Sequence, residues 1–532
     1  MFSLNFWKSK ALSAVFCVFV AASLSICLTG CGGGGDDDPV FSEQPPDEST
    51  VWELMRQAYT YTYPLMLMNA TIENGTNVAF PTNEQAPINQ LAHATYITDA
   101  SDFPREVNPT VEVLRSQAFI DLTDEPVVLE KPRADRFCNY EILDAYTNVV
   151  TNLGSGGDSD ERVYMLTGPN YRGSVPANMI QISMPTSLAW LVVRTICSGD
   201  DDLENVWSLQ NQMYIAPYSL YRSGGRAPEG VHNDLYNYIP KQHVFQMTCE
   251  EYFNLANELM LTNPPTAADE SLMRQLARIN IGPGKKFKTD ILGENGLRYY
   301  ETLKTELKGT WLSSGQQYLY TNNNWPFYSR DLGKYQTDYN YRACIADNDW
   351  GVPPNSVAIF TKRTKDDDGN TLSGAQNYKL HFTNFRYQKT PATPPVRDDG
   401  FWVIAVYDTN GYLVENDINR YVVTSHDEFD INEDGSLDIF LQNKELLATP
   451  TVDPNAIDAS SIRAAADPAN TASGTPTASP TASANWLPTG TGNFTVQMRI
   501  YLPKADTING GYRYPSIERA DKDKDKEKEK AK

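Results

Sequence analysis

The sequence predicts an α+β multidomain protein in which two β-rich domains, sandwich-like or barrel-like, flank a helical segment. Three observations carry this prediction. Strand-length runs of Val, Ile, Leu and Tyr, separated by Pro or Gly, occupy residues 125–196. Capping boxes and helically spaced apolar residues mark residues 201–307. From residue 356 the strand-length runs return, with Asp-Gly and Asn-Gly dipeptides that accept the positive φ of tight turns.

The N-terminus has the pattern of an exported lipoprotein. A short basic segment precedes the apolar residues 11–28, and the sequence Leu-Thr-Gly-Cys then ends at Cys31. Two small residues before a cysteine suit a lipoprotein signal peptidase, and the thiol is where the lipid is attached. The apolar run is shorter than the roughly 20 residues of a membrane-spanning helix. We therefore expect residues 1–30 to be a signal peptide and Cys31 to carry diacylglycerol and palmitate.

Residues 31–49 are rich in Gly, Asp and Pro, which predicts a flexible tether behind the lipid. The residue after the modified cysteine is Gly32 instead of the Asp that usually retains lipoproteins at an inner membrane. We expect the protein at the cell envelope, held by its lipid anchor and favouring the outer membrane. The membrane is then its first partner.

Composition bounds the function further. The formal net charge is −22, which argues against nucleic acid as a partner. With 41% hydrophobic residues, the chain can bury a sizeable core. Four cysteines follow the lipidation site: Cys138, Cys197, Cys249 and Cys344. An oxidising compartment would permit disulfides between them, and buried free thiols are the alternative.

The N-terminal β-rich domain is expected over residues 50–199. Thr50 and Glu53 form a capping box that opens a helix, and Pro64 bounds it. Five strands are predicted after it, at Glu125–Glu130, Phe137–Ala145, Val163–Thr167, Met179–Met184 and Ala189–Ile196.

Residues 200–330 form the predicted helical segment. Its helices begin behind Asp201 and Asp202, at the capping box of Thr248 and Glu251, and at a looser cap formed by Thr266 and Asp269. No strand is predicted between residues 201 and 307.

The C-terminal β-rich domain is expected over residues 331–519. Its strands are predicted at Ser356–Arg363, Tyr378–Phe382, Phe401–Asp408, Arg420–Ser425, Leu437–Gln442 and Phe494–Pro503. Residues 448–484, which are Ala, Thr, Ser, Pro and Asp with almost no large apolar side chain, predict a disordered insertion. The charged tail, residues 520–532, is likewise expected not to fold.

Several phrases resemble known families. Residues 121–129, Leu143-Asp144-Ala145-Tyr146-Thr147-Asn148, Gly168-Pro169 and Pro185-Thr186 resemble the domain of unknown function 1254. Residues 374–382, Phe401-Trp402, Asn419-Arg420-Tyr421, residues 434–437 and Asn485-Trp486-Leu487-Pro488 resemble its usual partner, the domain of unknown function 1214. Glu112-Val113-Leu114 departs from the Asp-Thr-Leu often found in the first family. The resemblance implies two β-rich domains with helices between them, and no activity.

The end of one predicted strand is the first candidate site. Asp144 could accept a proton or a sugar hydroxyl, while Tyr146 and Asn148 could position a ligand and Arg115 and Arg194 could supply positive charge. The alternative is structural: Asp and Asn side chains bond the backbone in turns, and Arg194 could pair with a buried acid.

The second candidate site is the aromatic stretch Tyr318–Trp350, whose rings are interleaved with Asn322, Asn323 and Asn324. Flat rings and amides suit sugars, and the alternative is a linker that packs its rings against both domains. Residues 430–438 resemble the start of a calcium loop, but Leu441 replaces the bidentate Glu, so a hairpin at Asp434-Gly435 is preferred.

No nucleophile elbow, zinc-protease helix, Walker or dinucleotide pattern occurs, and none of the five histidines is spaced for a local metal site. We predict neither a cofactor nor a metal. The favoured function is an extracytoplasmic lipoprotein that binds a small neutral or hydroxylated ligand, such as a glycan, between the two β-rich domains. One alternative is a hydrolase or lyase that uses Asp144 with a remote histidine. The other is an envelope structural or assembly protein.

Overall fold

The computed structural model describes residues 47–520 except 103–106, 294, 329–331, 384–389 and 445–482. The signal peptide, the lipidated Cys31, the tether up to residue 46, most of the predicted insertion and the tail from residue 521 lie outside the described residues. Within the described part, no helix has the length and apolar character needed to cross a membrane.

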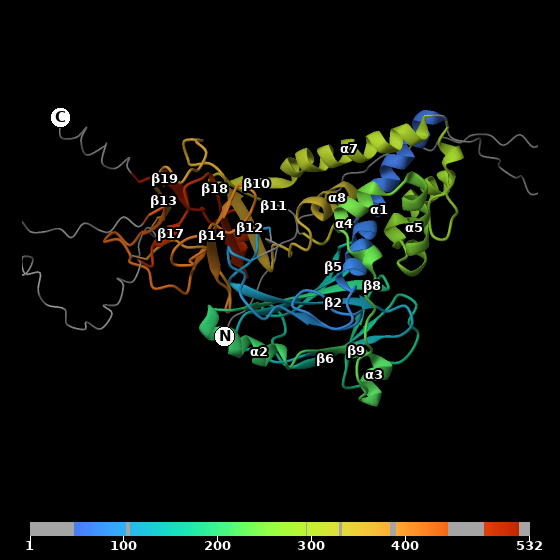
Figure 1. Cartoon of the computed structure of the whole chain (residues 1–532), viewed down its shortest axis with the longest axis horizontal. Coiled ribbons are helices and arrows are strands. Elements are labelled where there is room, and N and C mark those ends of the chain that lie inside the picture. Colours follow the sequence, from blue (N-terminus) through green and yellow to red (C-terminus); the bar gives the residue numbers. More distant parts are fainter. Residues whose placement is uncertain are drawn as a thin grey trace, which may run out of the picture. The chain divides into compact units, whose positions relative to one another are not determined.

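The N-terminal β-rich region consists of two open sheets packed face to face. A five-stranded sheet has the order β1-β2-β8-β4-β5 and a four-stranded sheet the order β7-β6-β3-β9. In Figure 1, β2 and β8 of the first sheet lie above β6 and β9 of the second. Their facing side chains, among them Ile120, Tyr140 and Leu166, form one buried cluster. The strands are β1 (Ala92–His93), β2 (Val113–Asp121), β3 (Val127–Lys131), β4 (Cys138–Asp144), β5 (Val149–Gly154), β6 (Arg162–Thr167), β7 (Ile180–Ser183), β8 (Leu188–Ile196) and β9 (Tyr214–Pro217).

All five strands predicted in this region are confirmed, as β3, β4, β6, β7 and β8. The prediction missed β2, although it pairs with β8 over nine residues from Val113 to Asp121. Arg115, Ser116 and Gln117 interrupt its apolar pattern, so no strand-length apolar run is visible. It also missed β9, which pairs with β3 from inside the segment that was predicted to be helical.

The C-terminal part of helix α1 (Glu48–Gly75) packs on the outer face of the five-stranded sheet. Its Met68 and Ile72 pack against Phe119 of β2 and Trp190 of β8. Two details of the predicted helix were wrong. The N-cap is Asp47, whose carboxylate accepts from the Thr50 N–H, so the helix starts earlier than expected. Pro64 lies inside the helix instead of bounding it, because buried packing on both sides outweighs one lost hydrogen bond.

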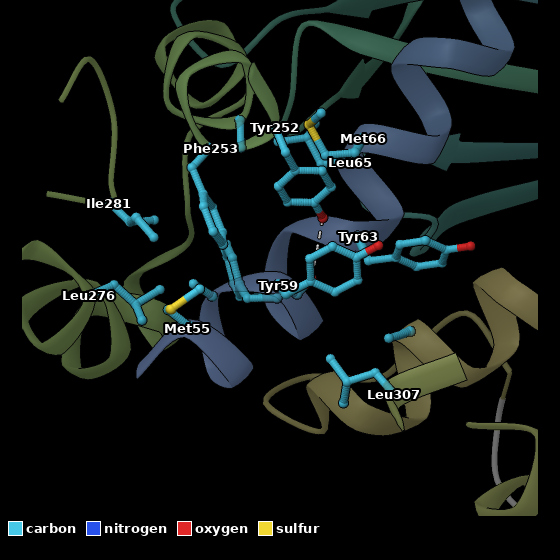
Figure 2. Close-up of a cluster of buried hydrophobic side chains, with 14 of the residues drawn as sticks. Met55, Tyr59, Tyr63, Leu65, Met66, Tyr252, Phe253, Leu276, Ile281 and Leu307 are labelled. Carbon is cyan, nitrogen blue, oxygen red and sulfur yellow. Dashed lines mark hydrogen bonds between the residues drawn. The ribbon is translucent and has the colours of Figure 1, made fainter. Parts of the chain in front are cut away.

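The helical segment forms its own core against α1 (Figure 2). Tyr59 of α1 stacks on Tyr252 of α5 with ring centroids 4.6 Å apart, and Phe253 and Leu276 lie in the same cluster. The predicted capping boxes at Thr248 and Thr266 are confirmed. The elements are η1 (Asp200–Asp202), α2 (Leu203–Gln210), α3 (Tyr218–Ser223), η2 (Asp234–Tyr236), α4 (Pro240–Gln246), α5 (Cys249–Thr262), η3 (Ala267–Asp269), α6 (Glu270–Leu276), η4 (Ala277–Ile279), η5 (Thr289–Leu292), α7 (Gly296–Ser314), η6 (Gly315–Tyr318) and α8 (Tyr339–Asn348).

The C-terminal β-rich region is also a pair of open sheets, with the orders β12-β18-β14-β15 and β17-β16-β13-β19. Leu380, Ile404 and Met498 lie in the buried cluster between them. The elements are the hairpin β10 (Leu319–Asn322) and β11 (Trp325–Tyr328), then β12 (Ala358–Arg363), β13 (Tyr378–Phe382), β14 (Trp402–Asp408), β15 (Val422–Thr424), β16 (Leu437–Gln442), β17 (Trp486–Pro488), β18 (Phe494–Tyr501), α9 (Ala505–Ile508) and β19 (Ser516–Arg519).

The six strands predicted here are confirmed as β12, β13, β14, β15, β16 and β18. The three turn glycines, Gly369, Gly411 and Gly435, have φ values of 85°, 85° and 86°, as the dipeptides predict. The predicted α+β class with two β-rich parts and helices between them is therefore confirmed, and both β-rich parts are sandwiches of open sheets rather than barrels.

Candidate functional site

Two adjoining cavities lie where the end of β8 and the residues after it meet the start of β14 and the end of β15. Each has a volume of about 530 Å³, and they share Ile196, Ser198 and His426, so we describe them as one cleft. The first cavity is lined by Arg136, Phe137, Ile196, Ser198, Asp201, Asp202, Asp399, Gly400 and His426. The second adds Ile97–Asp99, Val111, Glu112, Cys197, Gly199, Asp200, Phe401, Ile418–Val422, Thr424 and Asp427.

A buried ion pair holds the two sides of the cleft together. Arg499 of β18 donates from Nη1 to Oε2 of Glu112 at 2.8 Å, and both side chains are at most 2% exposed. The Tyr501 hydroxyl donates to the other oxygen of Glu112 at 2.7 Å. The guanidinium of Arg499 also bonds the Tyr407 hydroxyl and the Pro109 carbonyl. Glu112, part of the departure from the resembled family, is thus one of the residues that join the N-terminal β-rich region to the C-terminal one, as is Phe137, whose ring contacts Phe401.

A second ion pair fixes the wall of the first cavity. Arg136 donates from Nη1 to both carboxylate oxygens of Asp202, at 2.8 and 2.7 Å. Asp202 also accepts from the backbone N–H of Ser198 at 3.0 Å. Burial alone would raise the pKa of Asp202, but these bonds outweigh it and lower the pKa. The carboxylate is therefore held ionised at the start of α2.

The lining of the cleft is negatively charged. Arg136 and Glu112 are neutralised by the pairs just described, and the guanidinium of Arg420 bonds the backbone carbonyls of Ser483 and Trp486. His426 is exposed and stacks on Phe401 with centroids 5.6 Å apart. The carboxylates that remain after the two ion pairs are Asp99, Asp200, Asp201, Asp399 and Asp427.

The predicted site at the end of β4 is a buried turn. Asp144 is 4% exposed, and its Oδ1 accepts from the backbone N–H groups of Tyr146 and Asn148 at 2.8 and 2.9 Å. Its Oδ2 accepts from the Asn148 amide at 2.9 Å. Thr147 takes the positive φ of the turn, at 67°. Burial raises the pKa of Asp144, and the bonds from Asn148 oppose the shift. This geometry matches the structural alternative, and Asp144 is not among the residues that line the cleft.

The other predicted residues divide between two places. Tyr146 packs near Asp144 and donates to the carbonyl of Asn263 at 3.0 Å. Arg194 donates to Glu141 at 2.6 Å, and Arg115 is its cross-strand partner. Asp144 pairs with Ala189, five residues along β8 from Arg194 and hence roughly 16 Å away. The two arginines therefore do not reach the Asp144 turn, and Arg194 has the buried acid that the alternative named.

Tyr146 instead belongs to a cluster that the sequence did not indicate. The guanidinium of Arg342 lies 4.9, 5.0 and 5.2 Å from the ring centroids of Tyr61, Tyr146 and Tyr339. Tyr61 and Tyr339 both donate to the carboxylate of Asp269, at 3.2 and 2.7 Å. We call these five residues the tyrosine–arginine cluster. They come from α1, the β4 turn, η3 and α8, and no local spacing could have linked them.

The aromatic stretch packs into the protein rather than lining the cleft. Trp325 and Phe327 are at most 2% exposed, and the Trp325 indole donates to the Pro515 carbonyl at 2.8 Å. The amides of Asn322 and Asn323 donate to the carbonyls of Tyr512 and Tyr514 at 2.8 and 2.7 Å. Two of the three interleaved amides thus bind backbone, as the packing alternative expects, and the Asn324 amide donates to the Asp367 carboxylate at 3.5 Å.

The calcium-like loop is a turn. The backbone of Asn432 donates to Ser436 and accepts from Gly435, and Asp434 caps the same turn. Among the described residues, no cluster of three or more His, Cys, Asp or Glu side chains could hold a metal ion. The four cysteines after Cys31 are buried free thiols: Cys138, Cys197, Cys249 and Cys344.

One histidine–carboxylate pair resembles catalytic geometry but lies elsewhere. His381 of β13 contacts Asp438 of β16 at 2.6 Å, and Ser516 of β19 is directly opposite His381. The Ser516 hydroxyl donates to Glu518 at 2.8 Å instead of to His381. The three residues lie on a sheet face and are not part of the cleft lining, so the row has the residues of a triad without its hydrogen-bond chain.

Comparison with protein families finds two models on this chain. "Protein of unknown function (DUF1254)" matches residues 88–217, and "Protein of unknown function (DUF1214)" matches residues 357–459 and 446–505. The chain carries a DUF1254 domain followed by a DUF1214 domain. The predicted tandem resemblance is confirmed, and the cleft lies between residues of the two matched segments.

One solved structure supports the fold of this DUF1254–DUF1214 chain. The crystal structure of the VPA0106 protein from Vibrio parahaemolyticus matches with a TM-score of 0.61 at 18% identity, covering 88% of this chain and 100% of that one. An uncharacterised protein from Burkholderia cenocepacia matches with a TM-score of 0.36 at 11% identity, covering 88% and 92%. Comparison with curated proteins finds no match. The likeness to the Vibrio structure concerns the fold alone.

Proposed function

We propose that this DUF1254–DUF1214 chain is a ligand-binding protein of the cell envelope, and that its cleft takes a small hydroxylated molecule such as a glycan. The observation that carries the proposal is the cleft itself, which residues of both matched domains build together. Binding sites commonly form at such junctions, in cavities of about 300–1,000 Å³.

The lining supports a ligand that donates hydrogen bonds. An ionised carboxylate only accepts hydrogen bonds, and the walls carry Asp99, Asp200, Asp201, Asp399 and Asp427. Hydroxyl and ammonium groups satisfy such acceptors, whereas phosphates and carboxylates would be repelled. The ion pairs of Glu112 and Asp202 hold the walls in place before a ligand arrives, which reduces the entropy lost on binding.

A thermal-shift screen of the mature chain with neutral and amino-sugar trisaccharides tests the proposal. A binder should raise the melting temperature by mass action. Asp201→Asn and Asp427→Asn should reduce that rise, since both residues are exposed and line the cleft. Asp234→Asn is the matched control, an exposed aspartate outside the cleft lining. The proposal fails if no trisaccharide shifts the melting temperature, or if all three variants respond like the unchanged protein.

Chromatography of the same mixtures separates binding from turnover. Cleaved sugars would favour the hydrolase alternative. A hydrolase that uses Asp144 stays a prediction. The Asp144 carboxylate already accepts hydrogen bonds from Tyr146 and Asn148 of its own turn.

We also propose the lipoprotein form, anchored through Cys31 at the envelope and favouring the outer membrane. The support is the Leu-Thr-Gly-Cys sequence that ends the apolar run and the tether composition after it. Labelling cells with palmitate should mark the protein, and Cys31→Ala should abolish the label and release the chain from the membrane fraction. An unlabelled chain that stays with the membranes would contradict the proposal.

Envelope assembly is the second candidate function. Val231, Leu235 and Ile239 are 79%, 80% and 60% exposed within one short segment. Exposed apolar groups of this kind mark association surfaces when they are contiguous. A triple replacement by serine should leave the melting temperature unchanged and abolish any self-association seen by sedimentation. A monomeric unchanged protein would count against self-assembly.

A further inference from the structure

A separate cavity opens in the helical segment, between α1, α6 and the start of α8. Its volume is about 370 Å³. We call it the helical cavity. None of its lining residues belongs to the cleft; they are Glu53, Arg56, Gln57, Thr60, Ala268, Ser271, Leu272, Gln275, Thr337, Tyr339 and Asn340.

The lining of the helical cavity is polar but neutral, unlike that of the cleft. It holds one acid and one base, Glu53 and Arg56. Arg56 pairs with Glu306 at 3.2 Å, and Glu53 accepts from the Gln57 amide at 3.0 Å. Apart from the apolar Ala268 and Leu272, the others are amides and hydroxyls, groups that both donate and accept: Gln57, Thr60, Ser271, Gln275, Thr337, Tyr339 and Asn340.

One wall residue has an unused hydroxyl. Thr60 is 4% exposed, and its Oγ1 has no hydrogen-bond partner among the described residues. Other threonines of the same helix behave differently: Thr62 and Thr71 each donate to the carbonyl four residues earlier, at 2.7 Å. A buried hydroxyl without a partner costs about 1–3 kcal/mol, so a partner for Thr60 is expected to come from outside the helix.

The backbone at Thr60 also lacks its usual partner. In an α-helix the carbonyl of residue 60 accepts from the N–H of residue 64, and here residue 64 is Pro64, which has none. The proline therefore leaves the Thr60 carbonyl without its helical donor, at the residue that also carries the unpartnered hydroxyl. Together they can accept from, and donate to, one hydroxyl-bearing ligand.

A rigid aromatic ring completes the wall. The Tyr339 hydroxyl donates to Asp269 at 2.7 Å, and its ring meets Tyr61 edge-on with centroids 5.2 Å apart. Arg342 packs over the same ring at 5.2 Å. The tyrosine–arginine cluster thus fixes Tyr339 from behind, and Leu272 adds an apolar surface on the cavity side. A fixed ring beside amides suits a molecule with both C–H and O–H faces.

We infer that the helical cavity is a binding site for a neutral, hydroxylated molecule of monosaccharide size, distinct from the proposed cleft ligand. Its volume is near the lower end of the range for ligand sites. An anionic ligand would find no uncompensated positive charge there, because Arg56 is paired with Glu306. A sugar hydroxyl would satisfy Thr60 while a sugar face packs on Tyr339.

Isothermal titration of the mature chain with glucose, N-acetylglucosamine and myo-inositol tests the inference. Thr60→Val removes the unpartnered hydroxyl with little change in shape, and should weaken binding about tenfold, the effect of one buried hydrogen bond. Without sugar, Thr60→Val should melt at the same or a higher temperature, because a buried unsatisfied group has been removed. The matched control, Thr71→Val, removes a bonded hydroxyl on the same helix and should bind normally.

Gln275→Ala supplies a second variant, because this residue is exposed on α6 and its loss does not disturb the core. It should also weaken sugar binding, whereas Asp427→Asn in the cleft should not. The inference is overturned if none of the three probes binds. It is equally overturned if Thr60→Val and Gln275→Ala bind like the unchanged chain, or if Asp427→Asn removes the monosaccharide signal.

Discussion

Two buried arginines occupy two regions of the molecule, and their surroundings differ. Arg499, between the β-rich regions, contacts a carboxylate at 2.8 Å and also bonds Gln497 and the Pro109 carbonyl. Arg342, in the helical core, lies among three tyrosine rings and donates to the Tyr61 carbonyl at 3.0 Å. Its Nε is buried without a hydrogen-bond partner among the described residues.

Arg499 has a partner for its charge and joins two parts of the protein, whereas Arg342 lies beside polar groups that have no hydrogen-bond partner in the described part of the chain. At Arg499 the charge and the donors are matched, so the junction beside the cleft is a fixed frame. Around Arg342 the partners are rings and carbonyls, and the nearby Thr60 hydroxyl is also unpartnered. Polar groups left unsatisfied in a native core call for an explanation such as an absent ligand or ordered water. In the helical core, Thr60 is such a group, and it lines the helical cavity where the inferred ligand would bind.

The largest expected effect is at the junction. Arg499→Met leaves Glu112 buried without its positive partner, and should lower the free energy of unfolding by about 3–5 kcal/mol. Urea unfolding followed by tryptophan fluorescence measures the change. The double variant Arg499→Met/Glu112→Leu removes both charges and should recover most of the loss. A loss below about 1 kcal/mol in the single variant would mean that the ion pair does not join the regions in solution.

The second effect is at Arg194, which the sequence suggested as a ligand contact. Burial raises the pKa of its partner Glu141, and Arg194 opposes the shift. Arg194→Met removes that opposition and should cost about 2–4 kcal/mol at pH 7. Because the folded pKa of an acid is then raised further, the loss should shrink at pH 5 as Glu141 binds a proton. A loss independent of pH would contradict the pairing.

Some elements of this fold can be predicted from the local sequence, and others cannot. Strands with continuous apolar runs, such as β4 and β8, and helices with capping boxes, such as α5, follow from local chemistry. Strand β2 could not be predicted in this way, because Arg115 and Gln117 interrupt its apolar pattern in the middle of the strand. α1 continued through Pro64, because tertiary packing on both sides outweighed the local signal.

The candidate sites were harder to predict for a different reason. Asp144, Tyr146 and Asn148 were correctly placed at a strand end, but Arg342 and Asp269 come from segments far away in the chain. The acidic cleft needs β8 and β15 side by side, which no local pattern specifies. Residue types could be read from the sequence, whereas their convergence depends on the topology.

The third expected effect is the loss of stability when Arg342, in the helical core, is replaced. Arg342→Met should cost only about 1–2 kcal/mol, because no ion pair is broken and the lost contacts are one carbonyl bond and cation–π packing. Urea unfolding beside Arg499→Met gives the comparison directly. Equal losses in the two variants would show that Arg342 compensates a buried carboxylate, such as Asp144, whose pKa it lowers.

The smallest effect belongs to His381 and Asp438, a pair that is neither deeply buried nor at the cleft. The hydrogen bond with Asp438 is the main cause that raises the pKa of His381. Burial would raise the pKa of Asp438, but His381 outweighs it and lowers the pKa. Asp438→Asn should therefore cost less than about 1 kcal/mol, as for partly exposed pairs, and the cost should depend on pH.

The sign follows from linkage. A histidine with a raised folded pKa adds stability below its unfolded value of 6.5, and that stability is lost as the pH rises through the folded pKa. An aspartate with a lowered folded pKa adds stability above its unfolded value of 3.8, lost as the pH falls through the folded pKa. The difference between the unchanged chain and Asp438→Asn should therefore be greatest between these two values and decline toward pH 8. A difference that grows toward pH 8 would show that His381 is neutral in the pair. The buried Arg499–Glu112 pair would then be the stronger test of how charge stabilises this fold.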